Sequence, residues 1–386
     1  MQLYIFNPEN DLALADGGAA YCPPPHAARI AYDLASLPLW FAGSGAVVLP
    51  DMLHAQFRSG LSGMFSLAPA FENSMMPGVI SCHPWGWSPQ IRRRLKAMGV
   101  DESILPSDET VASVRNLSNR QSSIDILSAL KGKGIDIPPM PLYLTSPDDV
   151  AAFIGSMPRS VIKAPWSGSG KGIAWGIGRV EVPVENFYKG VIKRQGGVVC
   201  EHFLDSVQEF AMEFLVGGNG VQFAGYSLFD AVRGSYSGNV LATDERIEDV
   251  LSQYLPLGHI RKVRRLLTEL LAVRLAGSGY NGYIGVDMMI YRDGDAIRLN
   301  PCMELNVRMN MGVVSRIFHD RYVAPGKEGR FSVIYYKNNG EALAEHIALM
   351  QEKSLVVEDG RVLSGYISLS PVTSESRYVA RVVIEK

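Results

Sequence analysis

The feature that most constrains the fold is a short apolar strand, 161–163, that ends in Lys163 and runs directly into a glycine- and serine-rich turn. Residues 166–172 of this turn read Trp-Ser-Gly-Ser-Gly-Lys-Gly. Glycines allow backbone N–H groups to approach and surround phosphate oxygens, which makes the turn a candidate phosphate-binding loop. The Walker pattern is excluded, because the positions that it reserves for Gly and for Ser or Thr hold Pro165 and Gly172. A plain surface loop after a strand is the alternative for this segment alone.

Length and composition indicate a globular protein of more than one domain. The chain has 386 residues, of which 47% are hydrophobic and 20% are charged. Single cores stop growing at roughly 250–300 residues, so two or three domains are expected. A formal net charge of -2 offers no overall basic field for nucleic acid or an anionic membrane. Small-molecule partners are therefore favoured.

The cysteine spacing favours a reducing compartment, and the apolar segments indicate neither a signal peptide nor a membrane span. No two cysteines are close enough in sequence for a zinc motif or a secreted disulfide framework; they are Cys22, Cys82, Cys200 and Cys302. The first residues lack the basic start and apolar stretch of a signal peptide. The longest apolar tract, 37–50, is shorter than the about 20 residues that span a bilayer. We expect a cytoplasmic protein without a membrane segment.

Alternating strand and helix patterns predict an α/β fold with three parts. Buried strands at 3–6 and 46–49, with a helix at 91–98, indicate an N-terminal α/β domain over 1–115. A second unit, 116–200, begins with a helix near 119–127 and contains the strand that ends in Lys163. The third unit, 201–386, completes the chain.

The third unit is expected to be built on antiparallel sheet. Residues 208–230 alternate apolar and polar positions around the turn 217–220, which is typical of a hairpin. Four further strands and one helix are predicted, the helix at 260–276 and the strands at 283–290, 296–306, 362–368 and 378–384.

A second chemical signal lies on two successive strands of this unit. Asp287 lies on the first, and Glu304, Asn306 and Arg308 follow on the second at every other position. Residues two apart in a strand project to the same face. Two carboxylates and an amide oxygen suit Mg2+, and a neighbouring arginine would meet negative charge on a transferred phosphoryl group. A solvated strand face is the alternative, but the flanking residues are apolar.

These signals, in this order over about 116–312, resemble the ATP-grasp superfamily. The resemblance implies the ATP-grasp fold after a pre-ATP-grasp N-terminal domain, with a lysine strand and a flexible small-residue flap over ATP. Lys163 matches the phosphate-binding lysine and Arg120 matches an earlier basic residue that is more usually lysine. The flap residues that match are Ser167, Gly168, Ser169 and Gly170.

The resemblance also implies an adenine hinge and a metal site. Glu201, His202 and Leu204 match the hinge, and Glu209 matches the acid that accepts from the ribose hydroxyls. Asp287, Glu304 and Asn306 match the ligands of Mg2+, with Mn2+ as an alternative ion, and Arg308 joins Lys163 as a catalytic residue. The separation of Asp287 from Glu304 is several residues longer than usual.

A shorter separation on the second strand would select Asn300 as the ligand instead of Glu304. Glu304 is preferred here, because a ligand that bridges two metal ions should carry charge.

Three other segments are candidates for the substrate side. Arg233 and Asn239 lie in a segment, 233–239, whose arginine and hydroxyl groups could hold a carboxylate. Residues 7–11 follow the first strand and could face a substrate or form only a turn and helix cap. The aromatic segment 83–87 could line a pocket, although packing of a buried loop is the simpler reading.

The resemblance implies a ligase that uses ATP to convert a carboxylate into an acyl phosphate, which an amine or similar nucleophile then attacks. Kinase-like phosphoryl transfer and a nucleotide-binding module without turnover are the alternatives. The acid and the nucleophile are not specified by the sequence, and a homodimer is left open.

Overall fold

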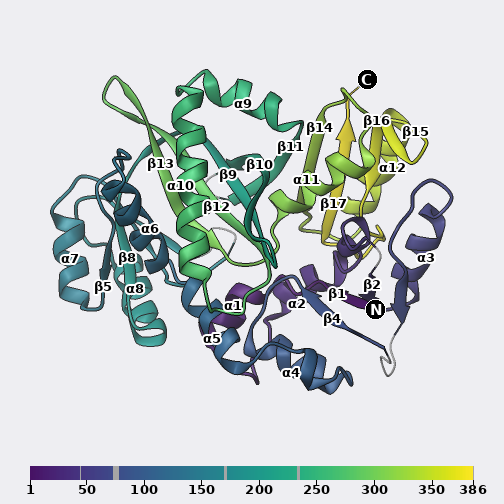
Figure 1. The fold of residues 1–386 in the computed structure, drawn as a ribbon, viewed down its shortest axis with the longest axis horizontal. Coiled ribbons are helices and arrows are strands. Elements are labelled where there is room, and N and C mark those ends of the chain that lie inside the picture. The colour runs from purple at the N-terminus through teal and green to yellow at the C-terminus, as the bar shows by residue number, and fades with distance from the viewer. Residues whose placement is uncertain (44, 73–77, 169–171, 233–234, 386) are drawn as a thin grey trace.

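The computed structural model describes residues 1–43, 45–72, 78–168, 172–232 and 235–385, which contain three β-sheets (Figure 1). In Figure 1 a small antiparallel sheet lies at the left, a large, nine-stranded sheet extends from the centre to the C-terminal strands at the right, and the N-terminal part lies below the large sheet. None of the described helices has the length and apolar character needed to cross a bilayer.

The N-terminal part is a parallel sheet with strand order β3-β2-β1-β4. Its strands are β1 (Gln2–Ile5), β2 (Ala46–Leu49), β3 (Ala70–Glu72) and β4 (Ser81–Pro84), and its helices are α1 (Asn10–Asp16), α2 (Pro25–Asp33), α3 (Met52–Leu61), α4 (Pro89–Ala97) and α5 (Asp108–Leu117), with short 3-10 turns at Leu37–Trp40 and Glu102–Ile104. Parallel strands need crossovers, which the helices supply. The carboxyl ends of neighbouring β1 and β4 therefore meet at one edge.

The small sheet carries the lysine strand. Its order is β5-β8-β6-β7, all antiparallel, from β5 (Leu142–Leu144), β6 (Ser160–Lys163), β7 (Ile173–Gly176) and β8 (Val198–His202). The helices α7 (Pro147–Gly155) and α8 (Val182–Gln195) cover it around a core that includes Ile162 and Tyr188. Lys163 is the last residue of a fully buried strand, and the glycine-rich turn follows it.

The large sheet has the order β13-β12-β9-β10-β11-β14-β17-β16-β15. Its strands are β9 (Asp205–Gly217), β10 (Gly220–Val232), β11 (Ser235–Leu241), β12 (Gly282–Asp293), β13 (Ala296–Asn306), β14 (Gly329–Tyr335), β15 (Val356–Glu358), β16 (Arg361–Ser368) and β17 (Tyr378–Ile384). The helices beside it are α6 (Gln121–Gly132), α9 (Asp244–Ser252), α10 (Leu257–Leu275), α11 (Met311–Tyr322) and α12 (Glu341–Glu352).

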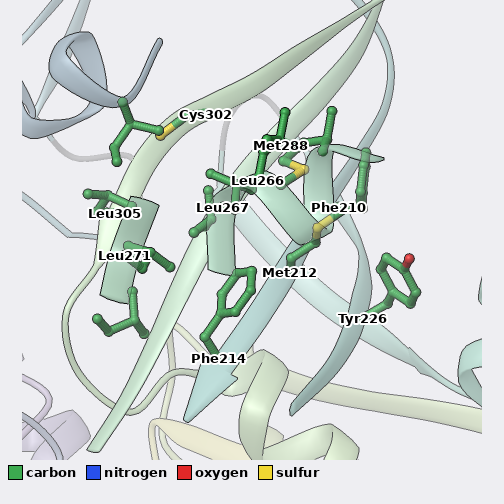
Figure 2. Packing of buried hydrophobic residues seen from close by; sticks show 14 of the residues in the cluster. Phe210, Met212, Phe214, Tyr226, Leu266, Leu267, Leu271, Met288, Cys302 and Leu305 are labelled. Carbon is green, nitrogen blue, oxygen red and sulfur yellow. The ribbon is translucent and has the colours of Figure 1, made fainter. Parts of the chain in front are cut away.

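Helices α6, α9 and α10 bury one face of this sheet. Figure 2 shows Leu266, Leu267 and Leu271 of α10 packed over Phe210 and Met288 of the strands. Burial of one such side chain stabilises the fold by roughly 1.5–3 kcal/mol. Because alternate strand residues face opposite sides, the residues between these apolar positions point to the other face, where α11 and the N-terminal part pack.

The structure confirms the strands and helices predicted from periodicity and adds others. The hairpin 208–230 is β9 and β10, and the last predicted pair is β16 and β17. The reading of 83–87 as a loop was wrong at its start, because the first two residues pair in β4 beside β1. The division at 115 and 200 stays a prediction, and helix α6 of the middle unit packs on β13 and α10 of the large sheet.

Candidate functional site

Lys163 and Glu201 form an ion pair on neighbouring strands. Their Nζ and Oε2 atoms are 2.6 Å apart, and both side chains are largely buried. Strand β6 pairs with β8 antiparallel, which places Lys163 beside Val199 and Glu201 two positions further on, on the same face. Because Lys163 is a buried cation, it can bind an incoming anion if that anion replaces Glu201 as its partner.

Arg120 connects the glycine-rich turn to the acidic strand. Its side chain is 4% exposed. Its Nη1 donates to the carbonyl of Ala164 and to Ser167 Oγ, each at 2.6 Å, while Nη2 donates to both carboxylate oxygens of Glu304 at 2.9 and 2.8 Å. Arg120 lies at the start of α6, where its backbone N–H donates to Pro165. One guanidinium therefore joins the glycine-rich turn to Glu304, which lies 184 positions after Arg120 in the sequence.

Asp287 and Glu304 are direct partners across β12 and β13. Burial, together with the negative charge of Glu304, raises the pKa of Asp287 to about 7. Asn306 Nδ2 donates to Asp287 Oδ2 at 3.0 Å. Since a cation would relieve the repulsion between the two carboxylates, this oxygen-rich corner favours a metal ion.

Asn300, the alternative ligand, lies opposite Met289 instead. Its side chain is 3% exposed, and its Oδ1 accepts a hydrogen bond from the backbone N–H of Cys302 at 3.2 Å.

Arg308 lies beside the amide of Asn306, but it follows the end of β13 and does not continue the strand as the alternation predicted. Its Nη2 donates to Asn306 Oδ1 at 2.9 Å. Its other principal partner is Asp11 of α1, whose two carboxylate oxygens accept from Nε and Nη2 at 2.8 and 2.7 Å. A residue of the N-terminal segment 7–11 therefore reaches the predicted catalytic arginine.

The candidate segments 7–11 and 83–87 are hydrogen-bonded to each other at the edge of the N-terminal sheet. The amide of Asn7 exchanges hydrogen bonds with the backbone of Gly86, and a Cβ on Gly86 would lie 2.4 Å from the side chain of Asn10. The carbonyl of Trp85 accepts from Met309 N–H at 2.8 Å. These contacts fix both segments against the loop that follows β13.

The residues predicted to form the adenine hinge connect the small antiparallel sheet to the large sheet. Glu201 and His202 end β8, Leu204 lies in the short link, and β9 begins at the next residue. Glu209 lies on β9 opposite Met289. Burial raises its pKa, and the Ser206 hydroxyl and the charge of Lys163 partly offset this rise.

Three of the predicted site residues lie outside the described residues, and one predicted substrate-side residue is buried. Ser169, Gly170 and Arg233 fall outside the described residues. Asn239 is described on β11; it is completely buried and donates to Ser227 Oγ at 2.5 Å.

Glu213 is a buried carboxylate close enough to Asp287 to feel its charge, and sequence reasoning did not single it out. It lies on β9, opposite Gly285 of β12, and is 1% exposed. Its Oε2 accepts from Asn310 Nδ2 at 2.7 Å, and a Cβ on Gly312 would lie 2.4 Å from its Oε1. Burial is the main reason that its pKa rises to about 8, with a smaller contribution from Asp287. A carboxylate among Ala211, Met212, Phe214 and Leu215 was the available signal.

Within the described residues, no group of three or more His, Cys, Asp or Glu side chains is arranged to hold a metal ion. The predicted ligand set has two carboxylates and one amide, so it does not require such a group.

Comparisons with known proteins find structural but not sequence relatives. Neither a protein-family model nor a curated protein sequence matches the chain. Among solved structures, all of this chain aligns with 93% of N5-carboxyaminoimidazole synthetase from Staphylococcus aureus, crystallised with ADP, at 12% identity and a TM-score of 0.51. N5-carboxyaminoimidazole ribonucleotide synthetase from Thermus thermophilus is 12% identical, with 94% of its chain covered and a TM-score of 0.52.

Biotin carboxylase from Campylobacter jejuni, as its beta-gamma-ATP complex, is 11% identical over all of this chain and 87% of its own, with a TM-score of 0.53. The likeness to these three structures extends over the full length of this chain. The chain therefore has the ATP-grasp fold, preceded by an α/β domain.

Proposed function

We propose that this protein is an ATP- and Mg2+-dependent ligase that activates a carboxylate as an acyl phosphate for attack by an amine or similar nucleophile. The observation that carries the proposal is Arg120, which binds Ser167 of the glycine-rich turn and Glu304 of the acidic strand at once. The nucleotide-side and metal-side residues thus converge, as a phosphoryl-transfer site requires. Structural neighbours that are ATP-dependent carbon–nitrogen ligases support the reaction class.

Each part of the reaction has a residue to serve it. Lys163 and Arg120 would bind phosphate oxygens, and the hinge from Glu201 to Leu204 would accept adenine through its backbone. Glu209 would accept from the ribose hydroxyls. Arg308 would neutralise negative charge on the phosphoryl group in the transition state of its transfer.

Asp287, Glu304 and Asn306 would hold Mg2+, and their carboxylate and amide oxygens fit this ion and also Mn2+. When bound, the ion would neutralise phosphate charge and polarise the transferred group. The substrates are small-molecule acids and amines, bound between the N-terminal part and the large sheet. A cytoplasmic location is part of the same proposal, and none of the four cysteines is in a disulfide.

Millimolar MgATP is expected to raise the melting temperature, because a ligand at 100 times its dissociation constant stabilises the folded state by about 2.7 kcal/mol. Lys163→Met should reduce this shift strongly, since it removes the cation paired with Glu201. Lys189→Met is the matched control, because Lys189 forms an equally short ion pair with Glu185 on the surface of α8. An equal shift with Mg2+ and tripolyphosphate would contradict a nucleotide site.

Product analysis separates ligation from phosphorylation. Pools of carboxylates and amines that stimulate ADP release should yield one amide per ADP. ADP release with a phosphorylated hydroxyl compound and no amide would instead establish the kinase-like alternative.

A further inference from the structure

The salt bridge between Asp11 and Arg308 joins two parts of the protein at the proposed reaction site. Asp11 lies in the first turn of α1, and Arg308 follows the end of β13. Both carboxylate oxygens are used, and the two side chains are 18% and 15% exposed. A bidentate pair of this kind fixes the plane of the guanidinium as well as its charge.

The remaining contacts of Arg308 show what this orientation achieves. Nη1 donates to the carbonyl of Met309 at 3.1 Å, and Nη2 donates to Asn306 Oδ1 at 2.9 Å. Nη2 is therefore shared between Asp11 and the amide that also contacts Asp287. Among the groups that accept hydrogen bonds from Arg308, Asp11 is the carboxylate, and it holds Arg308 beside the proposed ligand Asn306.

Asp11 also meets the glycine-rich turn. A Cβ on Gly168 would lie 2.6 Å from Asp11 Oδ2, closer than Cβ contacts allow. Since Gly168 has no Cβ, the turn can lie directly against the carboxylate. The same side chain thus contacts the arginine and limits how closely the turn can approach it.

Helix α1 is anchored well enough to act as a support. The hydrogen bonds between Asn7 and Gly86 fix the segment that precedes α1. At the other end of the helix, Arg115 Nε donates to the carbonyl of Leu14 at 2.7 Å. The helix packs against α4 of its own domain and α8 of the small sheet. Asp11 is consequently presented from a fixed element.

We propose that Asp11 is a positioning residue, which orients Arg308 toward the phosphoryl group and sets the approach of the turn at Gly168. This inference rests on the proposed function. It assigns the N-terminal segment 7–11 a role in stabilising the transition state. A salt bridge that only joined two domains would affect stability alone.

The test compares two nucleotide complexes and needs no knowledge of the acid or amine. ADP–Mg2+ with aluminium fluoride resembles the phosphoryl group in flight, whereas ADP–Mg2+ does not. Asp11→Asn should weaken binding of the aluminium fluoride complex by about 10- to 100-fold, as expected for a misplaced catalytic group. Binding of ADP–Mg2+ should change less than about threefold, because Asp11 acts on the transferred group.

Asp125→Asn is the matched control. Asp125 forms a 2.8 Å ion pair with Arg274 that links α6 to α10, and its side chain is 51% exposed. It should leave both affinities unchanged. If Asp11→Asn lowers only the melting temperature and leaves both affinities at the wild-type value, the positioning role is wrong while the nucleotide site stands. If the wild-type protein binds neither complex, the proposed function fails, and the inference fails with it.

A double-mutant cycle tests the contact with the turn. Gly168→Ala should weaken binding of the aluminium fluoride complex in the wild-type background, because its Cβ meets Asp11. In an Asp11→Ala background this loss should be smaller, since the space is then open. Equal losses in both backgrounds would refute the part of the proposal that concerns Gly168.

Discussion

Glu304→Gln is expected to reduce ADP release by roughly two orders of magnitude or more, with a smaller loss of nucleotide affinity. The substitution keeps the shape of the side chain but removes the charge that lies opposite Asp287 and beside Arg120. A Mg2+ titration of ADP release should show a higher concentration requirement. Glu269→Gln is the control, since Glu269 also pairs with an arginine, at 2.6 Å, but on the exposed face of α10.

Asn300→Ala should have a much smaller effect in the same titration. Its Oδ1 accepts from Cys302 N–H within the strand, and loss of one such bond costs about 1 kcal/mol. A normal Mg2+ response in Glu304→Gln together with its loss in Asn300→Ala would move the metal site along β13. This result would also contradict the roles proposed for Asn306 and Arg308.

Glu213→Gln is expected to stabilise the protein in the absence of ligands, increasingly so as pH rises from about 5 to 8. Burial raises the pKa of Glu213 to about 8 in the folded state, from 4.5 for an ordinary glutamate. Between these values the unfolded chain loses the proton while the folded chain keeps it, so wild-type stability falls with rising pH. One pKa unit corresponds to about 1.4 kcal/mol, so the difference at pH 8 should amount to several kcal/mol at most.

Urea unfolding at several pH values measures this difference directly. Glu352→Gln, at the exposed end of α12, is the control and should follow the wild type. Parallel pH profiles for wild type and Glu213→Gln would show that Glu213 is charged in the folded protein across this range.

Local patterns were sufficient for much of the fold and for the strands that carry several candidate site residues. Lys163 ends an apolar strand, and Glu304 and Asn306 alternate along another, so periodicity and turn chemistry placed them correctly on their elements. The pairing of Asp287 with Glu304 also follows from a hairpin whose two strands are visible in the sequence.

The remaining contacts depend on how distant elements pack. Nothing near Arg120 indicates that it will bind Glu304, because the turn and β13 meet only when the two antiparallel sheets are assembled. The pairing of Asp11 with Arg308 similarly requires the N-terminal domain to be docked. Glu213 was overlooked because its position in an alternating strand looked like an ordinary solvent-facing one, whereas α11 covers that face.

The sequence separation of 297 positions from Asp11 to Arg308 affects how the protein is synthesised. The N-terminal α/β domain emerges from the ribosome long before the arginine that its first helix must bind. Contacts of such large sequence separation form late and slow folding, so a nascent chain would hold a folded N-terminal domain with an exposed, unpaired Asp11. The proposed catalytic arrangement would therefore be completed only after Arg308 has left the ribosome, when ATP can first be committed to chemistry.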